Sequence, residues 1–92
     1  MMIAEVKIDI IKPSNGLIGF ASIVIDNNFY LSGIAIHKKL NSSGFRITYP
    51  SKGNFTIFHP INKETSQEIE RAVFEKLKDV MKKVDNYAEK TL

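Results

Sequence analysis

The sequence predicts an α+β domain, in which an antiparallel meander of about five strands precedes one long C-terminal helix. Two observations lead to this prediction. Residues 3–58 contain short alternating or apolar runs separated by turn clusters, a pattern typical of strands joined by hairpins. The period then changes to that of a helix over about 63–88. The length fits one domain spanning residues 1–92, with no linker or internal repeat.

The first three strands differ in how their apolar side chains are distributed. Val6, Ile8 and Ile10 alternate with charged residues, which predicts a strand with one buried face. The next run is apolar on both faces, as expected of a central strand, and the asparagine-containing clusters around it favour tight turns. We expect these strands at residues 3–11, 17–25 and 29–37.

Two shorter strands complete the predicted sheet. Apolar residues alternate over residues 45–49, and Pro50 ends this strand because proline lacks the N–H group that a central strand requires. The fourth strand is therefore expected at an edge of the sheet. A turn is expected at 51–54 and a fifth strand at 55–58.

One apolar stripe at spacings of three and four predicts the C-terminal helix. Its members are Ile69, Val73, Leu77, Val80, Val84 and Tyr87. Two residues are candidates for capping the start of the helix: Asn62, or Thr65 in a capping box with Glu68. Acidic residues prevail early in the helix and lysines later. Their interaction with the helix dipole is expected to stabilise the helix by about 0.3–1 kcal/mol per well-placed charge.

The amount of apolar surface predicts a second copy of the chain. One helix cannot cover both faces of a sheet, yet the run at 17–25 is apolar on both, and Phe74 and Met81 widen the helix stripe. A homodimer covers this surface most economically, whereas the alternative is that strand curvature hides it in one monomeric core. The residues expected at the dimer interface or in the core are Phe20, Val24, Val73, Phe74 and Leu77.

Residue types that support catalysis or metal binding are sparse. There is no Cys, and His37 and His59 lack the spacing of metal ligands, so we expect each ring to bond a neighbouring backbone group. Neither a nucleophile elbow nor a glycine-rich phosphate loop occurs. No apolar run approaches the roughly 18 residues of a membrane helix. We therefore expect no enzymatic activity, metal, cofactor, small-molecule substrate or membrane partner.

The net charge of +3 lies entirely in residues 1–62, because residues 63–92 hold seven basic and seven acidic residues. The bases that gather around the predicted fourth strand are Lys38, Lys39, Arg46 and Lys52. With Phe45, Tyr49 and Phe55 they form a candidate surface for nucleic-acid phosphates. The alternative is that lysines protect the sheet edges from aggregation.

Two motifs resemble those of a known family. Tyr49-Pro-Ser-Lys52, followed by Phe58-His-Pro-Ile-Asn62, resembles the P-S-[RK] … H-P-I-[NT] signature of the SpoVG family, and the similarity covers residues 3–77. The resemblance implies a bacterial, cytoplasmic and homodimeric α+β protein without catalytic activity. It also implies a regulator linked to septation and sporulation that binds DNA and, in some members, RNA.

The sequence departs from the family pattern at the start of the helix. The family commonly has two basic residues where this chain has Ser66 and Glu68, so family contacts at those positions do not carry over. Lys52 matches the basic position of the first motif, and Lys38 and Lys39 add positive charge where the family often has an acidic residue and a glycine. We therefore expect a nucleic-acid-binding regulator with its phosphate contacts at the loops. The alternative is a protein-interaction module that uses the sheet edge and the apolar helix face.

Overall fold

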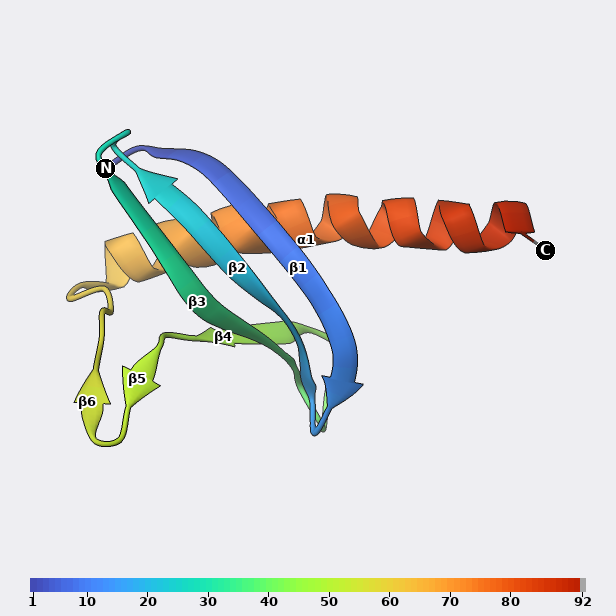
Figure 1. The fold of residues 1–92 in the computed structure, drawn as a ribbon, viewed down its shortest axis with the longest axis horizontal. Coiled ribbons are helices and arrows are strands. Elements are labelled where there is room, and N and C mark those ends of the chain that lie inside the picture. The colour runs from blue at the N-terminus through green and yellow to red at the C-terminus, as the bar shows by residue number, and fades with distance from the viewer. Residues whose placement is uncertain (92) are drawn as a thin grey trace.

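A computed structural model of the chain describes the backbone of residues 1–91 and the side chains of residues 1–83. The predicted α+β fold is confirmed: an antiparallel sheet is followed by one helix (Figure 1). Four strands form a meander in the order β1-β2-β3-β4. The elements are β1 (Ile3–Ser14), β2 (Leu17–Ile25), β3 (Phe29–Lys38), β4 (Phe45–Thr48) and, after a small second sheet, α1 (Lys63–Thr91).

Tight turns join the first three strands. Asn15 and Gly16 have φ angles of 52° and 89° between β1 and β2, and Asp26 and Asn27 have 54° and 57° between β2 and β3. Two consecutive residues with positive φ make a type I′ turn, whose twist matches that of the flanking strands. The expected hairpin turns at both positions are confirmed.

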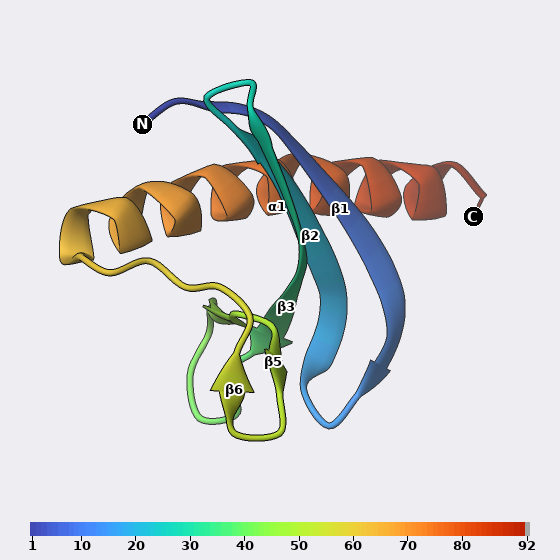
Figure 2. The same cartoon turned by 60° about the vertical axis from the view of Figure 1, so that its left-hand side comes forward.

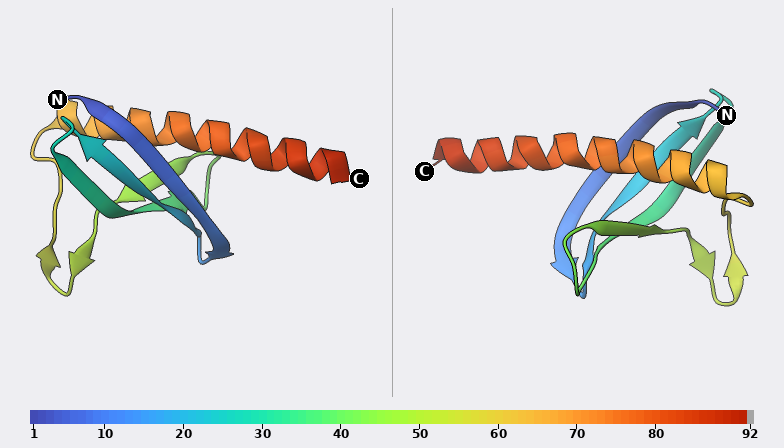
Figure 3. Two further views of the ribbon diagram at one scale, coloured as in Figure 1. Left: turned by 45° about the horizontal axis from the view of Figure 1, so that its top comes forward. Right: turned by 180° about the vertical axis from the view of Figure 1, so that it is seen from behind.

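The hydrophobic core lies between α1 and one face of the sheet (Figure 3). Val73 on α1 has 0% of its surface exposed, and Leu77 is also buried. Burying such a side chain stabilises the fold by about 1.5–3 kcal/mol. The part of the predicted helix stripe formed by Ile69, Val73 and Leu77 therefore packs within one chain. The fully buried residues of the core are Ala21, Ile23, Ile34, Ile36, Ile69, Val73 and Leu77.

The prediction of a fifth strand in the main sheet is wrong. β6 (Phe55–Thr56) pairs instead with β5 (Ser51–Lys52) in a separate two-stranded sheet, which projects as a hairpin (Figure 2). Pro50 explains the departure, because its lack of an N–H group ends β4 and directs the chain away from the sheet. The Ile57 N–H donates to the Pro50 carbonyl at 2.9 Å and closes the hairpin at its base.

Asn62 caps the N-terminus of α1. Its Oδ1 accepts a hydrogen bond of 2.8 Å from the Thr65 N–H, so of the two candidate caps Asn62 is confirmed and Thr65 lies in the first turn. The 29 residues of α1 span about 43 Å, and the helix runs past the sheet to Thr91 rather than ending near residue 88 (Figure 1). Within the described part of the chain, no helix has the length and apolar character needed to cross a membrane.

Candidate nucleic-acid interface

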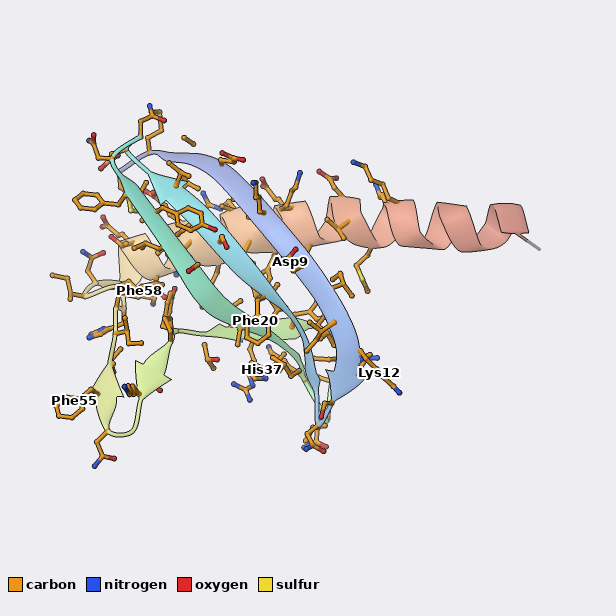
Figure 4. The ribbon with its side chains drawn as sticks, viewed as in Figure 1. Asp9, Lys12, Phe20, His37, Phe55 and Phe58 are labelled. Atoms are coloured by element: carbon orange, nitrogen blue, oxygen red, sulfur yellow. The ribbon has the colours of Figure 1, made fainter. Side chains whose placement is uncertain are left out.

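The face of the sheet opposite α1 carries side chains that are open to solvent (Figure 4). Phe20 is 38% exposed there, although its neighbours in sequence, Gly19 and Ala21, are buried on the α1 side. The strand register places Tyr30, which is 65% exposed, opposite Val24 on the same face. We call this surface the open face and define it by Phe20, Val24, Tyr30, Ala35, His37 and Arg46.

The five residues expected at a dimer interface or in the core divide into two groups. Val73 and Leu77 are buried in the core of one chain, and Phe74 is half-buried against it. Phe20 and Val24 lie on the open face instead, because alternate residues of β2 point to opposite sides of the sheet. The doubly apolar pattern of β2 therefore reflects one core face and one face without a helix.

Lys38, Lys39 and Arg46 line one cavity of about 340 Å³. The backbone around it is held by two hydrogen bonds: the Lys38 N–H donates to the Gly16 carbonyl at 2.7 Å, and the Lys39 N–H donates to the Gly44 carbonyl at 3.1 Å. None of the described residues that line the cavity is acidic, so its positive charge has no carboxylate beside it in the lining. We call this site the cationic cavity; its other lining residues are Asn15, His37, Leu40, Asn41 and Ser42.

Lys52, the fourth predicted base, lies apart from the cationic cavity. It is exposed on β5, beyond the end of β4, whereas the cavity lies at the start of β4 (Figure 1). Its cross-strand partner is Phe55, which is 79% exposed. Tyr49 and Phe45 are both half-buried and pack against the core. Phe45 is nevertheless the cross-strand partner of Lys38 and lines a cavity of about 480 Å³ with it, so only Tyr49 lies apart from the bases.

His37 connects the open face to the cationic cavity. Its Nε2 lies 3.0 Å from the Thr48 Oγ1, so the expected backbone hydrogen bond is replaced by a bond to a hydroxyl group. The two side chains meet because β3 and β4 place them in adjacent rows of the same face. Burial lowers the pKa of His37 below its ordinary value of 6.5, and the Arg46 guanidinium lowers it further. The ring is therefore neutral at pH 7.

The backbone hydrogen bond predicted for His59 is confirmed. Its Nδ1–H donates to the Pro60 carbonyl at 3.0 Å, and this bond shapes the segment that leads into α1. Within the described residues, no group of three or more His, Cys, Asp or Glu side chains is arranged to hold a metal ion.

Tyr49 joins β4 to the first turns of α1. Its ring packs edge to face on Phe58, with 6.0 Å between ring centroids and an interplanar angle of 69°. Burial raises the pKa of its hydroxyl, the Glu70 carboxylate raises it further, and the nearby Ser66 hydroxyl acts in the opposite direction without forming a well-aligned hydrogen bond. Ser66 thus lies near Tyr49 and is not among the residues that line the cationic cavity.

An apolar groove follows α1 on the other side of the β3–β4 loop. It consists of two cavities of about 430 and 480 Å³ that share Phe45 and Met81. Phe74 and Leu77 line the first cavity, and Ile10 lines the second. We call this surface the apolar groove. Lys38, Lys78 and Lys82 also line it, so the apolar groove differs from the cationic cavity in its apolar side chains and not in its number of basic residues.

The fold and the site together define a small α+β domain with one open sheet face and one cationic cavity. The SpoVG family profile matches residues 1–79. Septation protein SpoVG of Phytoplasma australiense is 38% identical over 86 residues, which cover 88% of each chain. Its counterpart in an Exiguobacterium species is 38% identical over 80 residues, or 82% of this chain and 79% of the relative. That of Clostridium novyi is 32% identical over 91 residues, or 94% of this chain and 89% of the relative.

The chain therefore belongs to the SpoVG family, as its motifs indicated. The relatives are named as septation proteins, and this is not a known enzyme family.

Proposed function

We propose that this protein is a cytoplasmic, non-enzymatic regulator that binds nucleic acid through the cationic cavity. The observation that supports the proposal most strongly is the convergence of Lys38, Lys39 and Arg46 on one cavity with no acidic lining residue. The helix is a weaker candidate surface, because residues 63–92 have equal numbers of basic and acidic residues. Phosphate binding releases counterions from nucleic acid, so clustered and unneutralised cations are what such binding requires.

The proposal is tested by fluorescence anisotropy with labelled DNA and RNA at several salt concentrations. Lys38→Ala/Lys39→Ala should weaken binding to unrelated sequences and reduce the slope of log K against log salt by up to about two. Lys76→Ala/Lys78→Ala removes the same charge from α1 and should change the slope little. Lys52→Ala tests whether the hairpin contributes a phosphate contact of its own.

Either of two outcomes would contradict the proposal. If the helix pair alters the slope and the loop pair does not, the cationic cavity is not the site. If no DNA or RNA binds even at about 50 mM salt, the protein is an interaction module instead, and its apolar groove becomes the binding surface.

We further propose that two copies of the chain associate through the apolar groove. The support is that α1 extends past its own sheet and leaves Phe45 and Met81 beside two apolar cavities. The helix stripe continues in sequence to Val84 and Tyr87, whose side chains lie outside the described residues. A symmetric pair can cover both overhanging helices at once.

Light scattering should therefore give twice the chain mass of 10.4 kDa at micromolar concentration. Met81→Glu should shift the protein towards the single-chain mass, because it places a charge in the groove while leaving the buried core intact. Lys83→Glu, at an exposed position on the same helix, is the control. A wild-type mass of one chain would contradict the dimer.

A further inference from the structure

We propose that the open face binds the bases of single-stranded nucleic acid, with the Phe20 ring as a stacking platform and the cationic cavity holding the phosphates. This inference rests on the proposed nucleic-acid function and names the class of nucleic acid that the site accepts.

The position of Phe20 makes its ring available for stacking. The register places it directly opposite Ala35, whose small side chain leaves space above β3. His37 is two residues farther along β3, and Figure 4 shows Phe20 and His37 close together on the side of the sheet away from α1. Aromatic and imidazole rings are the side chains on which unstacked bases pack.

The stacking surface borders the cationic cavity. His37 lines the cationic cavity and pairs across the strands with Arg46, which also lines it. β4 and β2 are separated by two strand spacings, or about 10 Å. A phosphate held at Arg46 therefore leaves its base free to reach across β3 towards Phe20.

The opposite edge of the open face has a different charge. Asp9 on β1 is the cross-strand partner of Phe20, and Glu5 is the partner of Val24, with Lys7 opposite Ser22 between them. The two carboxylates and one ammonium leave this edge with a negative charge, which disfavours a phosphate backbone along β1. The arrangement therefore orients the ligand, with its backbone over the β3–β4 side and its bases towards β2.

Stacking on Phe20 distinguishes single strands from duplexes. Base faces in a duplex are covered by neighbouring pairs, whereas in single strands and loops they are free for an aromatic ring. A duplex reader commonly inserts a helix into the major groove. Here α1 is packed along the sheet by Val73 and Leu77, and the exposed ring lies on a strand.

The test compares a single-stranded oligonucleotide, its duplex and an abasic strand of equal phosphate number, by anisotropy. Phe20→Leu should weaken binding of the base-containing single strand about fivefold or more while leaving duplex and abasic binding unchanged. Phe20→Tyr retains the ring and should preserve binding. Phe55→Leu removes another exposed ring, on the hairpin, and should have no effect.

Four results would overturn the inference. Equal binding of single strand and duplex by the wild type, or no loss with Phe20→Leu, would leave phosphate binding at the cavity but no base stacking. A change of oligomeric mass with Phe20→Leu would show that the open face is covered by a second copy. If the wild-type protein binds none of the oligonucleotides, including the abasic strand, the proposed function is wrong as well. This case is recognised without any variant.

Discussion

The two faces of the main sheet differ in burial, polarity and charge. The face towards α1 is closed by Ile23, Ile34 and Ile36, which are fully buried with Val73. The open face carries an exposed phenylalanine, a neutral histidine and an arginine over the same strands. Strand alternation allows this separation, because neighbouring residues point to opposite sides. One face thus stabilises the fold, and the other is open to solvent.

The largest effect is expected on the closed face. Val73→Asp should unfold the protein or cost several kcal/mol, because it buries a charge that has no partner among the apolar side chains of the core. Thermal denaturation followed by circular dichroism measures the loss. Gln67→Asp adds the same charge at an exposed position of α1 and should leave the melting temperature nearly unchanged. A folded Val73→Asp variant of wild-type stability would contradict the assigned core.

A smaller effect is expected where α1 begins. Asn62→Ala removes the side-chain bond to the Thr65 N–H and should lower the free energy of unfolding by about 1 kcal/mol. Asn62→Ser keeps a capping oxygen and should restore most of that stability. Chemical denaturation distinguishes these variants, and nucleic-acid affinity should not change in either. Equal destabilisation by both substitutions would show that the capping oxygen does not account for the contribution of Asn62 to stability.

The smallest effect concerns pH, which should change stability and nucleic-acid affinity in opposite directions. The folded-state pKa of His37 is lowered, so its contribution to stability is present above about pH 6.5 and is lost as pH falls towards the folded pKa. Over the same range, protonated His37 adds positive charge to the cationic cavity, so nucleic-acid binding should strengthen while stability declines. His37→Asn should remove both trends. Binding that weakens on acidification in the wild type alone would contradict the placement of His37 at the site.

Local patterns made most of the fold predictable. Alternation in β1, the asparagine-containing turns and the helical stripe each depend on residues close in sequence, and all three are found. The partner of residues 55–58 was not predictable in the same way, because the local pattern indicates a strand without saying which strand it pairs with. After Pro50 the segment pairs with β5 in a separate sheet instead of joining the edge of the main sheet. The sequence left both Asn62 and Thr65 as candidate caps. Only the geometry of the chain that enters α1 shows that Asn62 is the cap.

The candidate site was predictable only in part. Three bases near β4 in sequence also meet in space, but Lys52 follows the hairpin away from them. Phe20 was assigned to an interface or core on its hydrophobicity, and no local signal distinguishes a covered aromatic residue from an open one. His37 was treated as structural because the register that brings it beside Arg46 is a long-range property.

The central claim is that the open face and the cationic cavity, rather than α1 or the hairpin, contact nucleic acid. Titration of the isotopically labelled protein with a single-stranded oligonucleotide, followed by amide and side-chain chemical shifts, tests it most directly. The account predicts perturbations at Phe20, His37, Lys38, Lys39 and Arg46, with small changes along the exposed surface of α1. Perturbations concentrated on α1 or around Lys52, with the open face unchanged, would contradict it.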